Sequence, residues 1–223
     1  MSTAEGAERM QQPLAITIVS DIICPWCYIG TRRLSQALAS LRDVVSPVIT
    51  YHAFLLDPSI PPEGADLRDR LRRKYRVDPE AMFRRIEGAA HETGIALDFS
   101  RILRTPNTIP GHTLLRHARA RSTQAALADV LFTAYFVNGE DVGDAQVLAK
   151  LAVDFGFSRE EALRLVADER EHAATRDEAE AAARQGIRGV PYFTFGEQVA
   201  FSGAQPLDVF TRAIAQGVTG QVP

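Results

Sequence analysis

The sequence predicts an α/β fold in which a β-α-β half and a β-β-α half are separated by a long, all-helical insertion. Three observations lead to this prediction. A short β-branched run, "LAITIVSD", stands near the N-terminus; helical patterns fill residues 65–185, here called the helical block; and strand-like composition returns in "VPYFTFG". A helical block that interrupts a sheet must fold back over it, so we expect it to cover the start of the first helix.

The N-terminal half contains two predicted strands and one helix. Residues 14–21 are short, apolar and β-branched, which suits a buried strand. The following stretch, "IGTRRLSQALASL", places Ile29 and Leu34 near one face of a helix. A second strand is expected over residues 45–56, and the proline-rich segment "DPSIPPEG" ends it.

Within the helical block, two helix starts and one helix end are marked by specific residues. Asp78 followed by Pro79 is typical of a helix N-terminus. The sequence "SREE" at 158–161 fits a capping box in front of a single long helix, which Gly186 ends.

The C-terminal half is predicted as a hairpin followed by a helix. The runs "VPYFTFG" and "QVAFSGA" are β-rich, and Gly196-Glu197 provides the turn between them. Pro206 stands near the start of the last helix. We therefore expect three segments: the N-terminal half over 14–62, the inserted helical domain over 63–186 and the C-terminal half over 187–218.

The composition excludes several classes of partner. The 223 residues carry a formal net charge of −3, which gives no electrostatic reason to expect nucleic acid or an anionic membrane. No stretch approaches the roughly 18 apolar residues of a membrane span. The basic run "RDRLRRKYR" at 68–76 stands among acidic residues, so we interpret it as a solvated helix face. The N-terminal "MSTAEGAERMQQP" lacks the pattern of a secretory signal, which predicts a cytoplasmic protein of unassigned oligomeric state.

Both cysteines of the chain, Cys24 and Cys27, lie in "SDIICPWCYIG" at a strand-to-helix junction. Three interpretations compete: half of a metal site, a buried structural pair, or a dithiol that cycles with a disulfide. Zinc takes four ligands, or three and a water, and the five histidines lack a ligand spacing, so we predict no metal. A reducing compartment does not favour a lasting structural disulfide.

Placement at a helix start favours the redox interpretation. Unpaired backbone N–H groups and the helix dipole stabilise a thiolate there, and only the thiolate attacks a disulfide. Cys24 lies nearest those groups and is the expected nucleophile, while Cys27 can resolve the mixed disulfide. Pro25 stiffens the turn between them, and Trp26 provides an apolar surface beside the sulfurs.

A second motif, "GIRGVPYFTF", places Pro191 at the beginning of a late strand. An X-Pro bond can be cis. A cis bond after Val190 would leave the backbone groups of Val190 free to pair with an extended peptide as an added strand.

Taken together, "CPWC" and "GVPYF" resemble the thioredoxin superfamily, and the long helical insertion is typical of its DsbA-like branch. Three further stretches, "TPNTIPGH", "LFTAYFVNGEDVGD" and "GIRGVPYFTFGEQVAFSGAQP", resemble the FrnE-like group of that branch. The resemblance covers residues 14–216. This group is similar in fold to the 2-hydroxychromene-2-carboxylate isomerases and the kappa-class glutathione transferases.

The resemblance implies a thioredoxin fold and a set of site residues. Cys24 and Cys27 would be the attacking and resolving thiols, with Pro191 as the cis-proline facing them. Further substrate-binding residues would be Pro25, Trp26 and Val190 near the thiols, Asn107 and His112 from the helical block, and Ser202 and Gln205 beside the proline.

These expectations define three functions. The first is a thiol–disulfide oxidoreductase or isomerase acting on protein or small-molecule disulfides, with no bound cofactor and with glutathione as a candidate redox partner. The second is a glutathione-dependent isomerase or transferase acting on a small aromatic or polyketide-like compound, although such relatives usually carry serine where Cys24 stands. The third is a binding module that holds unfolded peptide and makes no use of the thiols.

Overall fold

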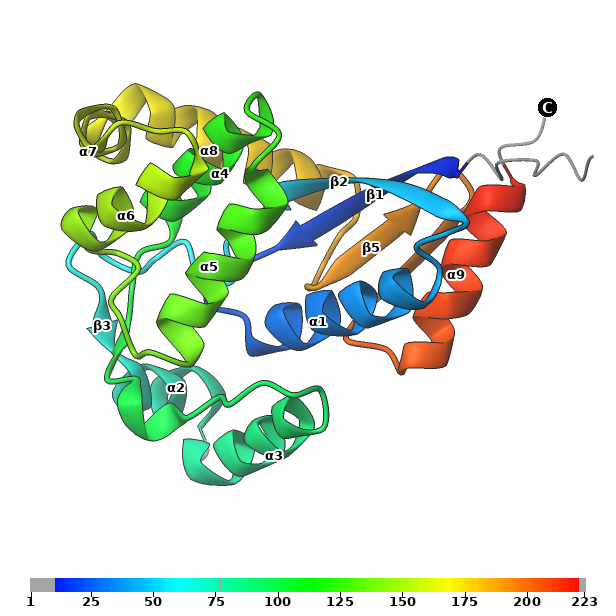
Figure 1. The fold of residues 1–223 in the computed structure, drawn as a ribbon. Coiled ribbons are helices and arrows are strands. Elements are labelled where there is room, and N and C mark those ends of the chain that lie inside the picture. The colour runs from blue at the N-terminus through cyan, green and yellow to red at the C-terminus, as the bar shows by residue number, and fades with distance from the viewer. Residues whose placement is uncertain (1–10, 77, 221–223) are drawn as a thin grey trace, which may run out of the picture.

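A four-stranded mixed sheet forms the centre of the protein, as seen in the computed structural model, which describes residues 11–76 and 78–220 (Figure 1). Its strand order is β2-β1-β5-β6, with β1 parallel to β2 and antiparallel to β5. The strands are β1 (Gln12–Ser20), β2 (Val45–Ala53), β5 (Tyr192–Phe195) and β6 (Val199–Ser202). Ile16 of β1 lies opposite Ile49 on one side and Phe195 on the other, so the two halves of the chain meet in one sheet.

Helices cover both faces of this sheet. Helices α1 (Pro25–Ser40) and α9 (Leu207–Thr219) lie side by side on one face (Figure 1). Ile18 is buried on that side in the main core, whereas its neighbour Val19 packs against Ala182 of helix α8 (Glu169–Arg184) on the other face. Successive strand residues point to opposite faces, which explains this division. The expected thioredoxin arrangement is confirmed.

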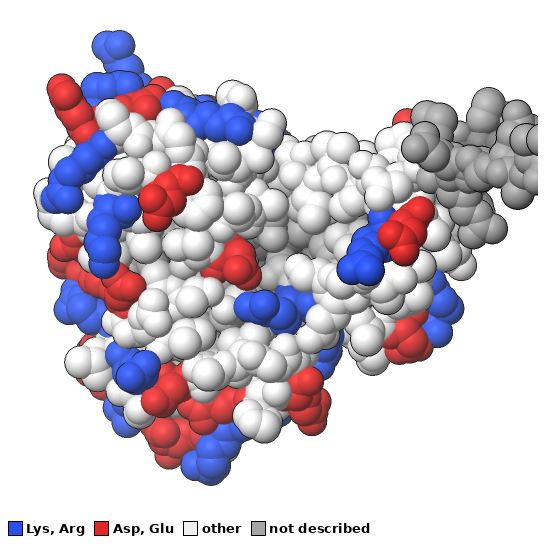
Figure 2. Space-filling view, in the orientation of Figure 1, with Lys and Arg blue, Asp and Glu red and all other residues white. Residues whose placement is uncertain are grey.

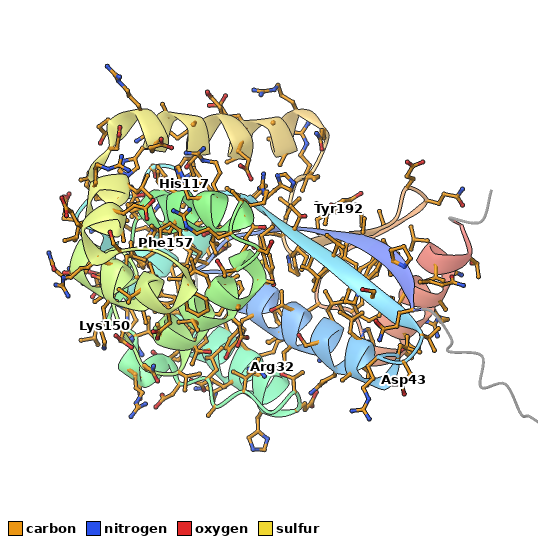
Figure 3. All side chains as sticks on the ribbon, turned by 45° about the horizontal axis from the view of Figure 1, so that its top comes forward. Arg32, Asp43, His117, Lys150, Phe157 and Tyr192 are labelled. Carbon is orange, nitrogen blue, oxygen red and sulfur yellow. The ribbon has the colours of Figure 1, made fainter. Side chains whose placement is uncertain are left out.

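The helical block joins β2 to β5 and contains the remaining elements. His117 and Phe157, labelled in Figure 3, lie within it. Its helices are α2 (Leu67–Tyr75), α3 (Pro79–His91), α4 (Ile109–Arg119), α5 (Gln124–Phe136), α6 (Ala145–Ala152), α7 (Arg159–Ala167) and α8, with 3-10 turns at Phe99–Arg101 and Val153–Phe155 and a short ladder between β3 (Ala65–Asp66) and β4 (Arg104–Thr105).

Two of the predicted boundaries in the helical block are confirmed. The Asp78 side chain accepts a hydrogen bond from the backbone N–H of Glu80, and Pro79 is the first residue of α3. Such a cap satisfies one of the N–H groups left free at a helix start. Gly186 follows the last turn of α8 with a φ of +86°, a conformation that favours glycine.

The prediction of one long helix after residue 158 is wrong. Ser158 does accept from the backbone N–H of Glu161, as a capping residue should. However, α7 ends at Ala167, and Asp168 adopts an extended backbone and caps α8 by accepting from the N–H of Arg170 at 2.8 Å. Aspartate competes for backbone N–H groups in this way, which favours a helix start over a helix interior.

The C-terminal hairpin is confirmed, but its loop contains three residues where we expected two. Phe195 pairs with Val199, so residues 196–198 form the turn. A second difference is the ladder in which Ala65 faces Thr105, since nearly all of that region was predicted to be helical. A two-residue strand has no periodicity of its own, so composition could not reveal it.

The surface carries mixed charges. On the face shown in Figure 2, lysine and arginine side chains alternate with acidic ones around broad uncharged areas. The basic run forms α2, where Arg72 lies 3.1 Å from Asp69 and Arg68 lies 3.0 Å from Glu80. Among residues 11–76 and 78–220, no helix is both long and apolar enough to cross a membrane, and no group of three or more potential metal ligands occurs.

Glu178 links the helical block to the sheet. Its carboxylate accepts hydrogen bonds from Arg119 of α4 at 3.0 Å and from the backbone N–H of Ala53 at the end of β2 at 3.3 Å, and it lies 3.0 Å from the Nδ1 atom of His52. Burial alone would raise the pKa of Glu178. The hydrogen bond with His52 and the charge of Arg119 outweigh burial and lower that pKa to about 2.

We predict that Glu178→Gln lowers the free energy of unfolding by about 2–3 kcal/mol near neutral pH. Because the folded-state pKa lies below the ordinary value of 4.5, this contribution is present above about pH 4.5 and is lost as the pH falls toward 2. Urea unfolding of both proteins at several pH values measures it. Glu180→Gln is the control, since Glu180 is exposed on the same helix and should change little. If the difference in unfolding free energy between the wild-type protein and Glu178→Gln does not shrink in acid, the role assigned to the Glu178 carboxylate is wrong.

Candidate active site

Cys24 occupies the N-cap position of α1. Its backbone is extended, with φ −91° and ψ 109°, and its carbonyl oxygen accepts from the N–H groups of Cys27 and Tyr28 at 3.0 and 3.3 Å. Pro25 is the first helical residue, where its missing N–H costs nothing. Cys24 therefore lies at the positive end of the helix dipole, and its side chain makes no capping hydrogen bond to the helix.

The Cys24 thiol contacts the strand that begins after Pro191. Its Sγ donates a hydrogen bond to the carbonyl oxygen of Val190 at 3.7 Å, and the Val190–Pro191 peptide bond is cis. The sequence motifs at residues 24–27 and 190–191 are therefore neighbours in space although more than 160 residues separate them. Cys24 lies on the wall of a cavity together with Pro25, Trp26 and Val190.

Cys27 is in a different environment from Cys24. It is fully buried, both thiols are free, and Cys27 does not line the cavity. Burial raises the pKa of the Cys27 thiol well above its ordinary value, and the neighbouring Cys24 raises it further. Cys27 is thus held as a neutral thiol, while Cys24 is the sulfur that a molecule in the cavity can meet.

Asp21 is a site residue that the sequence analysis missed. It is fully buried, its Oδ2 accepts from the backbone N–H of Leu56 at 2.7 Å, and its Oδ1 lies 3.3 Å from Nε2 of His112. A hydrogen bond with its backbone lowers the pKa of the Cys27 thiol, and its charge raises that pKa, while burial of Cys27 remains the main cause of the upward shift. An acidic residue at the end of an apolar strand, three positions before Cys24, is the signal that could have identified it.

The predicted residues of the helical block do not line the cavity. His112 is buried on α4 with its ring directed at Asp21. Asn107 holds its own loop: its side-chain amide donates to the carbonyl of Ile60 at 2.9 Å and accepts from the N–H of Ile109 at 3.0 Å.

Ser202 and Gln205 lie beside the strand that follows Pro191. Ser202 pairs with Tyr192, labelled in Figure 3, and its carbonyl accepts from the Gln205 side chain at 2.8 Å. The N–H of Gly203 donates to the carbonyl of Pro191 at 2.7 Å. Ser202 and Gln205 are therefore close to the proline segment but outside the lining of the cavity.

The cavity has a volume of about 220 Å³ and extends from Cys24 beneath the helical block. Its far wall is formed by side chains of α2, α3 and α5, among them Leu71, Met82, Phe83 and Phe136. The expectation that the helical block covers the start of α1 is confirmed. The guanidinium of Arg85 lies 6.0 Å from the centre of the Trp26 ring at the same end of α1.

Gly30 allows α1 to approach the C-terminal half closely. A Cβ atom at this position would lie 3.0 Å from Cζ of Phe193 and 3.2 Å from Cγ of Pro191. Phe193 is fully buried in the aromatic cluster under α9, so its ring has little room to move. The absence of a side chain at Gly30 thus sets the distance between Cys24 and the proline segment.

We predict that Gly30→Ala lowers the free energy of unfolding by about 1–3 kcal/mol, as overpacking does, and slows thiol exchange at Cys24. Gly88→Ala is the matched control, because Gly88 also lies inside a helix but a Cβ there meets nothing within 4 Å. Alanine should stabilise that helix by up to about 1 kcal/mol. Denaturant unfolding and the rate of thiol exchange at Cys24 are measured for both variants. If Gly30→Ala is stabilised as much as Gly88→Ala, the contact at Gly30 is unimportant.

The comparisons with known proteins agree with this geometry. A probable DsbA oxidoreductase from Streptomyces coelicolor is 31% identical, with a TM-score of 0.85 over 94% of this chain and 92% of that one. A 2-hydroxychromene-2-carboxylate isomerase has 17% identity and a TM-score of 0.71 over 91% and 95% of the two chains. The cytosolic disulfide reductase DsbM of Pseudomonas aeruginosa, solved with GSH, has 19% identity and a TM-score of 0.62 over 92% and 96%.

The family comparison covers nearly the whole chain. A family model for the DSBA-like thioredoxin domain matches residues 15–215, which include both cysteines, the helical block and the proline segment. The chain belongs to the DsbA-like thioredoxin-domain family.

Proposed function

We propose that this protein is a thiol–disulfide oxidoreductase that works through a mixed disulfide at Cys24 and an internal disulfide between Cys24 and Cys27. The observation that carries the proposal is the position of the Cys24 sulfur, at a helix N-terminus, on a cavity wall and against the carbonyl of Val190. Similarity to the probable DsbA oxidoreductase of Streptomyces coelicolor supports it.

In the first step, the Cys24 thiolate attacks one sulfur of a substrate disulfide. A bond forms between Cys24 and that sulfur, the substrate S–S bond breaks, and the other substrate sulfur leaves as a thiolate. Cys24 stands at the N-cap of α1, next to the positive end of the helix dipole. Pro25, Trp26 and Val190 form the surface that the substrate meets, with Pro191 holding Val190 in place.

In the second step, Cys27 releases the product. Its thiol loses a proton, the resulting thiolate attacks Cys24, and the substrate sulfur leaves, so the substrate gains two electrons and the protein is oxidised to a disulfide. The proton that Cys27 loses ends on the departing substrate thiolate, so protons and electrons balance. The raised pKa of Cys27 keeps it unreactive until the mixed disulfide has formed.

We further propose a cytoplasmic setting without a tightly bound cofactor, and glutathione as the redox partner. The cytosolic disulfide reductase of Pseudomonas aeruginosa, solved with GSH, supports this setting. The potential of the Cys24–Cys27 couple relative to glutathione decides the direction, because a value below the cytosolic poise favours reduction of substrates. Asn107, Ser202 and Gln205 act indirectly in this proposal, through the loop and strand segments that they hold.

We predict that Cys24→Ser abolishes insulin reduction, because no nucleophile remains at the cavity. Cys27→Ser should attack but not resolve, so it should accumulate a mixed disulfide that mass spectrometry detects after acid quenching. The chain contains no other cysteine, so the adduct can form only at Cys24. Circular dichroism confirms that both variants remain folded. Full insulin reduction by Cys24→Ser would refute the proposal.

A glutathione-dependent isomerase or transferase is the second candidate, favoured by the similarity in fold to 2-hydroxychromene-2-carboxylate isomerase. The same variants separate the two functions. An isomerase needs added glutathione and keeps its activity in Cys27→Ser, whereas the oxidoreductase loses turnover in that variant. A binding module would suppress aggregation equally well with both cysteines replaced.

A further inference from the structure

One cation at the open end of the cavity has unused hydrogen-bond donors. Lys74 of α2 lines the cavity, and its side chain is 36% exposed. Its ammonium group donates to the carbonyl of Leu56 at 3.0 Å, the one hydrogen bond that it makes to residues 11–76 and 78–220. An ammonium group carries three N–H donors, so two remain for an acceptor supplied from outside the chain.

The ammonium nitrogen of Lys74 lies among residues of the cavity wall. Besides the carbonyl of Leu56, its neighbours are Oδ2 of Asp57 at 4.0 Å and the ring of Tyr75, whose centre is 5.5 Å away. Leu56, Asp57 and Tyr75 all line the same cavity as Lys74. A molecule that fills the cavity therefore reaches this nitrogen.

A chain of hydrogen bonds holds Lys74 in a fixed relation to Cys24. The backbone N–H of Cys24 donates to the carbonyl of Asp21 at 3.0 Å, and the Asp21 carboxylate accepts from the N–H of Leu56 at 2.7 Å. The carbonyl of the same Leu56 accepts from the Lys74 ammonium. Because Cys24 and Lys74 also line one cavity of about 220 Å³, a single small molecule can contact the sulfur and the ammonium together.

The charges at this end of the cavity leave one positive charge in excess. Among the described residues, the charged ones that line the cavity are Asp57, Arg70 and Lys74. Asp57 and Arg70 form an ion pair, whereas Lys74 lies beyond hydrogen-bond distance of that carboxylate. Two acidic residues near the start of α2, Asp66 and Asp69, line an adjoining surface hollow but not the cavity. The uncompensated charge thus belongs to Lys74.

The rest of the cavity favours a short apolar chain. Leu71, Met82, Phe83 and Ile86 contribute to its walls. A cavity of about 150 Å³ lined by similar side chains holds one benzene molecule. The present cavity, at about 220 Å³, therefore has room for a chain of a few carbon atoms with one end group. Apolar walls that end at a cation fit an apolar chain that ends in an anion.

From these observations we propose that Lys74 determines substrate specificity: its ammonium group binds a carboxylate that the substrate disulfide carries a few carbon atoms from the sulfur attacked by Cys24. The inference rests on the proposed function, since it names the substrate class of the same site. The bonds made and broken are those of the exchange at Cys24, and the carboxylate only positions the disulfide. A small acidic disulfide and a peptide with an acidic residue beside cysteine share this chemistry.

The test compares disulfides that differ only in charge. The prereduced protein is mixed with 4,4′-dithiodibutanoate or with its diamide, and each second-order rate of reduction is divided by the rate with free dithiothreitol. We expect the acid to react about 5-fold faster at low ionic strength, the upper value for a partly exposed ion pair, and the preference to decrease as salt is added. Disulfide-linked dimers of the capped dipeptides Cys-Glu and Cys-Gln form the second arm. A preference seen in only one arm identifies the source of the carboxylate.

Substitution at Lys74 assigns the preference to its charge. In Lys74→Met, which keeps an unbranched side chain, the ratio of acid to amide rates should fall to about one, and Lys74→Arg should keep the preference. Arg73→Met is the matched control, because Arg73 is the neighbouring exposed cation on α2 and does not line the cavity. A ratio near one in the wild-type protein, or an equal loss of preference in Lys74→Met and Arg73→Met, would overturn the inference while leaving the proposed function intact.

A binding measurement tests the role of Lys74 separately from the redox chemistry. Trp26 is the only tryptophan in the chain and lines the cavity, so its fluorescence reports occupancy. We expect hexanoate to bind about 5-fold more tightly than hexanamide at matched ionic strength, and the difference to disappear in Lys74→Met but not in Arg73→Met. Equal binding of the two compounds, or binding of neither, would overturn the assignment even if the protein reduced no disulfide at all.

Discussion

The contact between Tyr28 and helix α5 determines how the helical block sits on the thiols. Tyr28 follows Cys27 directly, and its ring stacks on Phe132 and Phe136 with centres 5.3 and 6.0 Å apart. Its hydroxyl also forms a hydrogen bond with Oγ1 of Thr133 at 2.9 Å. The phenol oxygen is therefore not left unpaired in the core. Because Tyr28 belongs to the first turn after the cysteines, this contact fixes the sulfurs relative to the cavity walls.

This anchoring accounts for the different behaviour of two cysteines only three positions apart. Cys27 points toward the buried side, beneath the helical block, where burial raises the pKa of its thiol. Cys24 stands three residues earlier, at the N-terminus of α1, and reaches both the cavity and the carbonyl of Val190. The order of attack in the proposed mechanism thus follows from packing, since the chemistry of the two side chains is identical.

Features encoded by neighbouring residues could be predicted from the sequence. The start of α1 at Pro25, the cap at Asp78 and the hairpin near Gly196 are local signals, and each lies where it was expected. The pairing of Asp21 with His112 could not be predicted, because 91 residues separate them and only the folded chain brings both into the core.

The reactive sulfurs and most of the cavity wall come from different parts of the fold. The sheet, α1 and the proline segment supply the reactive sulfurs, while most of the cavity wall comes from the helical block. The insertion contacts the sheet through Glu178 and contacts α1 through Tyr28. Phe136 belongs both to the Tyr28 contact and to the cavity wall, so the position of the thiols and the lining of the cavity are coupled. The Phe136 ring thus connects the segment that carries the thiols with the segment that supplies most of the cavity wall.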